Sequence, residues 1–80
     1  MSDGRIVKRS VLLAGHRTSV SIEEPFWDAL KDMARARGLS LNSLIAQIDA
    51  ERQDANLSSA IRVAVLAHYQ DRDLAALRAG

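Results

Sequence analysis

The side chains best suited to chemistry in this 80-residue sequence alternate along one short segment near its start. Arg17, Ser19 and Ser21 follow one another at every second position, with Val20 and Ile22 in the intervening places. Successive side chains of a β-strand point to opposite sides, so this spacing predicts a strand with one polar and one apolar face. A guanidinium can make bidentate hydrogen bonds, and a hydroxyl can both donate and accept. The polar face is therefore predicted to be a hydrogen-bonding surface.

No catalytic or metal-binding arrangement accompanies this segment. The remaining serines stand where helix caps and strand surfaces explain them, and neither His16 nor His68 has a neighbouring acid that would orient it as a base. The sequence contains no cysteine, which excludes disulfides and thiolate metal ligands. Asp28 and Asp32 are four residues apart beside basic residues, a pattern typical of a solvated helix face. We therefore expect no enzyme activity, no bound metal and no cofactor.

A second run of β-forming residues precedes the alternating segment. The two runs, 6–13 and 17–22, are separated by Ala14-Gly15, and a glycine in the second central position suits a tight turn. A two-residue turn would place Leu13 opposite His16. The two runs are therefore predicted to form a β-hairpin.

This register sorts the side chains of the hairpin onto two faces. One face would hold the apolar residues Val7, Val11, Leu13, Val20 and Ile22. The other would hold Lys8, Ser10, Leu12, Arg17, Ser19 and Ser21. Arg9 does not fit, because it falls opposite Val20 on the apolar face. It indicates either a longer turn or a first run that is only partly a strand.

Three helices are predicted after the hairpin. Pro25 suits a first helical position, and apolar residues then recur at helical spacing over 25–37. Ser40 is a suitable cap for a second helix over 41–53, and Asn56 for a third over 57–69. Residues 71–80 either extend the third helix or fray.

The third helix and the small size of the chain both favour a second copy. Arg62 is the only charged residue within 57–69, and a helix that is apolar on nearly all sides needs cover on more than one side. A chain of this length buries only about 60 to 65% of its unfolded surface. We predict a homodimer with Val20, Ile22, Ile45, Ile48, Ile61 and Val65 in its core. The alternative is that the third helix forms the core of a compact monomer.

Charge is organised along the chain although the net charge is only +1. Residues 1–22 carry +3 and residues 23–54 carry −3. A basic first quarter is typical of a segment that faces phosphates, although four basic residues are also compatible with an ordinary solvated surface. The longest apolar runs have five residues or fewer, whereas a membrane span needs about twenty. Without a signal-like segment at the N-terminus, we expect a cytoplasmic protein that does not enter a membrane.

Three stretches carry a resemblance to a known family. HRTSVSIEEPFWDAL (16–30), RGLSLNSLI (37–45) and NLSSAIRV (56–63) resemble a bacterial family of ribbon-helix-helix domains, related to the Arc and methionine repressors. The resemblance covers about residues 9–70 and implies an intertwined homodimer. We therefore expect a single domain over 1–80 that is mostly α-helical with a short N-terminal β ribbon. Its core would lie within 9–70, residues 71–80 would form a tail, and an additional C-terminal helix would extend the family pattern.

The resemblance also implies a function and assigns residues to it. A two-stranded ribbon fits the major groove of DNA, so we expect a sequence-specific transcriptional regulator, such as a repressor, or the DNA-binding half of an antitoxin with a toxin partner. The expected base-reading residues are Arg17, Ser19 and Ser21. The expected phosphate contacts are Lys8, Arg9, Ser40, Asn42 and Ser43. If the helix over 57–69 takes the second-helix role instead, the phosphate contacts move to Ser58 and Ser59. The alternative function is a protein-interaction module on the same dimer scaffold.

Overall fold

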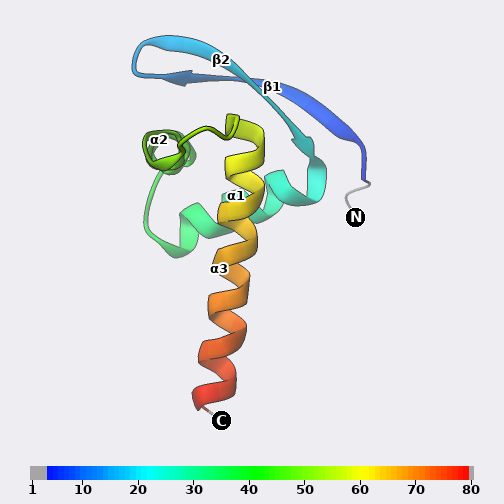
Figure 1. Cartoon of the computed structure of the whole chain (residues 1–80), viewed down its shortest axis with the longest axis vertical. Coiled ribbons are helices and arrows are strands. Elements are labelled where there is room, and N and C mark those ends of the chain that lie inside the picture. The colour runs from blue at the N-terminus through cyan, green and yellow to red at the C-terminus, as the bar shows by residue number, and fades with distance from the viewer. Residues whose placement is uncertain (1–3, 80) are drawn as a thin grey trace.

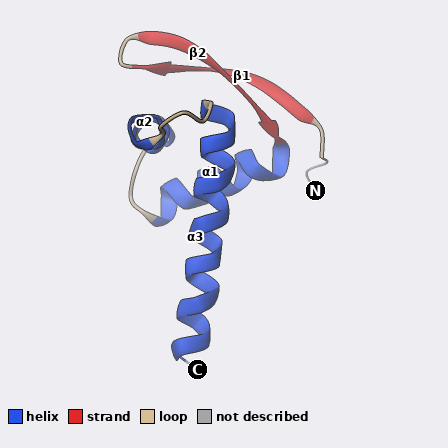
Figure 2. Cartoon of the chain, in the orientation of Figure 1, coloured by secondary structure: helices blue, strands red, loops and turns tan. Residues whose placement is uncertain are grey.

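The computed structural model describes residues 4–79, without the side chains of 74–76, 78 and 79. Its elements, in chain order, are β1 (Ile6–Leu13), β2 (His16–Glu23), α1 (Glu24–Ala36), α2 (Leu41–Glu51) and α3 (Leu57–Ala79). The ribbon of β1 and β2 lies across one end of the helices, and α3 extends away from it (Figures 1 and 2). The predicted order of a ribbon followed by three helices is confirmed. Asp3, which enters the charge count, and Gly80 of the predicted tail lie outside the described residues.

The turn between β1 and β2 sets the register of the hairpin. Ala14 and Gly15 have φ angles of 51° and 81°, which is the pair of positive values that a tight two-residue hairpin turn requires. Leu13 therefore lies opposite His16, and the pairing continues to Ile6 opposite Glu23. The predicted register is confirmed, and the first run is a strand along its whole length.

The ribbon has one face toward the helices and one toward solvent. Val11, Leu13, Val20 and Ile22 are each at most 8% exposed on the helix-facing side. Two strands alone form a marginal structure in water, so this apolar face needs the cover that the helices provide. The opposite face is thereby held toward solvent.

Local interactions define the ends of the helices. Gly38, with a φ of 68°, follows α1, and the amide of Leu39 donates to the carbonyl of Ala34 at 2.9 Å, which closes the helix end. The hydroxyl of Ser40 accepts a hydrogen bond from the amide of Ser43 at 3.1 Å and caps α2. The predicted cap of the second helix is thus present.

The C-terminal ends of α2 and α3 differ from their predicted positions by two residues or more, whereas both ends of α1 differ by one residue. α2 stops at Glu51 rather than near Gln53, because Arg52 adopts an extended backbone and its guanidinium donates to the carbonyl of Ala55 at 2.9 Å. The side chain of Asn56 accepts from the amide of Ser59 at 2.8 Å and caps α3, as predicted. α3 then continues to Ala79, so the predicted tail is largely helical.

The six residues predicted for the dimer core are already buried within one chain. Val20, Ile22, Ile45, Ile48, Ile61 and Val65 are at most 7% exposed. α3 turns Ile61 and Val65 inward, whereas Val63 and Leu66 on other sides are 66% and 56% exposed. These side chains are thus covered within one chain, and their place in the core of a dimer stays a prediction.

Replacing Ile61 by alanine tests this core. Its side chain is 0% exposed, and we expect Ile61→Ala to lower the free energy of unfolding by about 2 to 5 kcal/mol through lost burial and a residual cavity. Leu77→Ala on the same helix is the control, because Leu77 is 78% exposed. Urea denaturation measures both variants, and equal stability of the two would contradict the assigned core.

Candidate nucleic-acid interface

The outward face of the ribbon brings the predicted base-reading residues together. Arg17, Ser19 and Ser21 lie along β2, with Arg17 and Ser19 exposed and Ser21 half-buried. Lys8 on β1 is exposed directly opposite Ser21, and Ser10 lies opposite Ser19. The result is a continuous row of donors and acceptors with one cation near each end.

Leu12 is the apolar exception on this face. It lies on β1 opposite Arg17 and is 55% exposed. The sequence pattern also places Leu12 on the outward face. An exposed leucine beside a guanidinium gives the surface near the turn both an apolar and a cationic contact.

Residues of α3 form hydrogen bonds with the edge of β2 that faces away from β1. The amide of Ser21 donates to the hydroxyl of Ser58 at 3.1 Å, and Arg62 donates to the carbonyl of Ser21 at 3.3 Å. Arg62 also donates to the carboxylate of Glu23 at 2.9 Å. We call these four residues the edge clasp. It joins the start of α3 to the strand that carries the outward row, and sequence reasoning missed it because its members are far apart in the chain.

The charge of Glu23 depends on its hydrogen bonds. A hydrogen bond from its backbone amide, followed by that from Arg62, holds the pKa of the Glu23 carboxyl below its ordinary value. The carboxylate form therefore favours the folded state. The contribution of Glu23 to the stability of the folded state is fully present above the pKa that this carboxyl has in the unfolded chain. It is lost as the pH falls through the lowered pKa of the carboxyl in the folded chain.

Two helix starts flank the ribbon. Asn42 in the first turn of α2 borders a small hollow with Ser10, Leu12 and Arg17 of the hairpin. On the β2 side, the start of α3 borders a polar hollow of about 480 Å³ that includes Ser19. Backbone amides at a helix start can hold an anion. One residue of each predicted set of phosphate contacts, Asn42 of α2 and Ser58 of α3, therefore borders a hollow beside the ribbon.

Arg9 occupies a different place from the other basic residues of the ribbon. It lies on the helix-facing side opposite Val20, its guanidinium carbon is 4.5 Å from the ring centroid of Trp27, and it forms an ion pair with Glu24. These contacts explain how a cation is accommodated on an apolar face. They also mean that Arg9 could reach a phosphate only by breaking its ion pair, so this position does not suit the predicted phosphate contact.

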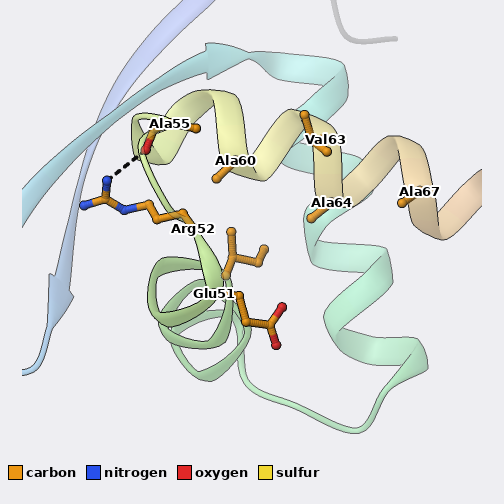
Figure 3. Close-up of a pocket in the computed structure, with 8 residues that line it drawn as sticks. Glu51, Arg52, Ala55, Ala60, Val63, Ala64 and Ala67 are labelled. Atoms are coloured by element: carbon orange, nitrogen blue, oxygen red, sulfur yellow. Dashed lines mark hydrogen bonds between the residues drawn. The ribbon is translucent and has the colours of Figure 1, made fainter.

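An apolar groove lies away from the ribbon, between the end of α2 and α3. Its volume is about 320 Å³, and alanines of α3 together with Val63 form much of its wall. Glu51 and Arg52 border it, and the hydrogen bond from Arg52 to Ala55 holds that side chain (Figure 3). The lining offers few polar groups to orient a small molecule.

The described part of the chain shows neither a metal cluster nor a membrane-spanning helix. Within residues 4–79, no group of three or more His, Asp or Glu side chains is arranged to hold a metal ion. Among the helices described there, none has the length and apolar character needed to cross a membrane.

The fold and its outward face define a small domain in which a β ribbon rests on helices. Residues 6–69 match the family model of the ribbon-helix-helix domain, so the chain belongs to this family. The fold is similar to the solved structure of an uncharacterized protein from Bordetella pertussis Tohama I, with 28% sequence identity and a TM-score of 0.75. The likeness covers 90% of this chain but 62% of that one, so this chain spans less than two thirds of its relative. No curated protein matches the sequence.

Removing the hydroxyl of Ser58 tests the edge clasp. We expect Ser58→Ala to speed hydrogen exchange at the amide of Ser21, which loses its acceptor, measured residue by residue by NMR. The amide of Val20, within the strand pairing with Arg9, is the internal control and should keep its protection. Unchanged exchange at Ser21 would show that α3 does not hold this edge.

Proposed function

We propose that this chain is a homodimeric, sequence-specific DNA-binding regulator that presents the outward face of its ribbon to the major groove. The observation that carries the proposal is the exposed row of Arg17 and Ser19 on a narrow ribbon, with Lys8 on the same face. The major groove is about 12 Å wide and admits two strands. Membership of the ribbon-helix-helix family, whose members typically bind DNA and dimerise, supports the same function.

Base reading is assigned to the β2 residues of this face. The exposed guanidinium of Arg17 can make two hydrogen bonds to the O6 and N7 atoms of guanine. The hydroxyls of Ser19 and Ser21 can donate to or accept from several base edges. Ser21 is the less exposed of the two, because the edge clasp lies beside it. We therefore assign the largest share of sequence discrimination to Arg17.

Phosphate contacts are assigned to Lys8 and to the helix starts beside the ribbon. Lys8 is exposed on the same side as the reading residues. On the α2 side the candidates are Ser40, Asn42 and Ser43, and on the α3 side they are Ser58 and Ser59. Because Ser58 binds the backbone of β2 directly, α3 is the better placed of the two to take the second-helix role. Arg9 is left out of this set because of its ion pair with Glu24.

A protein-interaction module, such as an antitoxin, is the second candidate function. The observation that favours it is the apolar groove beside α3, where Val63 is 66% exposed. An antitoxin could use both surfaces, with the ribbon on DNA and the groove on a toxin. A repressor acting alone would need only the ribbon and a second copy.

Replacing Arg17 tests the base-reading role. On a duplex selected for binding, Arg17→Ala should weaken the complex by about 1 to 3 kcal/mol and relax the preference at one position in each half-site. Arg35→Ala is the matched control, since Arg35 is an exposed arginine of α1 that pairs with Asp32. If Arg17→Ala bound every sequence as tightly as the parent protein does, the ribbon would not be the element that reads the bases.

Salt dependence separates the two candidate functions. Binding through several phosphate contacts should weaken steeply as salt rises, whereas an apolar protein contact should not. Lys8→Ala should make the slope of the logarithm of the binding constant against the logarithm of the salt concentration shallower by about one for each phosphate contact that Lys8 makes. The sequence preference should change little. A titration by fluorescence anisotropy measures both quantities, and a flat salt dependence would favour the interaction module.

A further inference from the structure

One leucine is exposed on the outward face of the ribbon, at a position where the fold does not require an apolar residue. Leu12 is 55% exposed, whereas Val11 and Leu13 on either side of it are 7% and 8% exposed. The alternation of the strand commits these two neighbours to the core and directs Leu12 to solvent. A polar residue would serve this strand position equally well, so the leucine is available for a contact with whatever the outward face binds.

The register places Leu12 beside the arginine to which base reading is assigned. Leu12 lies directly opposite Arg17. The backbone groups of Ser21 bind α3 rather than β1, so Ser21 belongs to a cross-strand pair without direct hydrogen bonds. Pairs of this type alternate along a hairpin, and Leu12 with Arg17 is another of them. In such a pair the Cα atoms are about 4.5 Å apart and the side chains approach each other closely.

The side chains of this pair also border a common hollow. Its volume is about 290 Å³, and Asn42 in the first turn of α2 forms part of its wall. Leu12 and Arg17 therefore present an apolar group and a cation to the same space. Ile6 is also exposed on β1, but it lies opposite Glu23 rather than opposite a cation.

Base pairs in the major groove present groups that match a leucine beside an arginine. Guanine offers its N7 and O6 atoms to an arginine, and thymine offers the methyl group on C5 to an apolar side chain. Successive nucleotides of one strand are spaced about 3.4 Å along the DNA axis, which is close to the separation of paired side chains on a ribbon. One cross-strand pair can therefore contact two neighbouring base pairs.

We propose that Leu12 and Arg17 together recognise a guanine next to a pyrimidine that carries a methyl group on C5. The inference rests on the proposed function, because it requires the ribbon to lie in the major groove. The side chain of Leu12 has no donor or acceptor, so it contacts the methyl group and not the hydrogen-bonding atoms of the base. Thymine and 5-methylcytosine carry the same methyl group. Methylation of a cytosine at this position therefore strengthens binding, and the methylation state of the DNA regulates it.

Removing the methyl group from the DNA tests the contact. In a duplex selected by the parent protein, the position at which Arg17→Ala relaxes the preference marks the guanine. Replacing the adjacent thymine by deoxyuridine removes only the methyl group. We expect the dissociation constant of the parent protein to rise about fourfold for each half-site, as for the loss of one buried methyl group. A selected site without a thymine next to this guanine would overturn the inference.

Two variants of β1 connect this loss to Leu12. Leu12→Ala should bind the thymine and uracil duplexes equally, because the apolar contact is gone. Ile6→Ala is the matched control, since Ile6 is 58% exposed on the same strand, and it should keep the preference of the parent protein for thymine. Equal sensitivity to uracil in the parent protein and in Leu12→Ala would show that the methyl group acts without Leu12.

Cytosine methylation is the second arm of the experiment. The same thymine is replaced by cytosine, paired with guanine, with or without a methyl group on C5. We expect the parent protein to bind the methylated duplex about fourfold more tightly for each half-site, and Leu12→Ala to bind both duplexes equally. A preference for thymine over uracil without one for 5-methylcytosine over cytosine would support the contact with thymine but overturn the response to methylation.

The outcomes separate this inference from the proposed function. If the parent protein enriches no sequence from a random pool of duplexes, the proposed function fails. If it selects a sequence in which Arg17 reads guanine, but removal of the adjacent methyl group leaves binding unchanged, the function stands and the reading by Leu12 is wrong.

Discussion

The burial of Val20 and Ile22 against the helices is the interaction on which the rest of the structure depends. Both side chains are 0% exposed, and they alternate with Ser19 and Ser21 along one strand. A two-stranded sheet has little stability of its own, so the helices must cover one of its faces. Once Val20 and Ile22 are committed to the core, the side chains between them can only point outward. The orientation of the candidate reading residues thus follows from hydrophobic burial rather than from any interaction on the outward face itself.

α3 links this core to the edge of the ribbon. Ile61 packs inside the chain, whereas Arg62, the next residue, reaches Glu23 and the carbonyl of Ser21. One turn of α3 therefore both buries an apolar side chain in the core and holds the edge of the strand in place. This arrangement leaves Val63 and its neighbours exposed, because the two other helices and the ribbon cover only one side of α3. The cover of this exposed side of α3 by a second copy, expected from the sequence, stays a prediction.

The pattern of residues predicted the register because the turn and the alternation agree. Ala14-Gly15 permits the two-residue turn, and that turn places Val11, Leu13, Val20 and Ile22 on one face, as the structure confirms. The role of Arg9 could not be foreseen in this way, since its partners Trp27 and Glu24 become neighbours only when α1 folds beneath the ribbon. The edge clasp was missed for the same reason. Local patterns predict strands and faces, whereas polar contacts between distant segments need the assembled fold.

A selection of bound sequences from a random pool of DNA duplexes, with the mass of the complex measured by light scattering, would show whether two copies of the chain read a DNA sequence together. We expect enrichment of a sequence with two-fold symmetry, bound by two chains. A protein that forms a stable dimer but enriches no sequence would argue against sequence-specific DNA binding and favour a protein-interaction module.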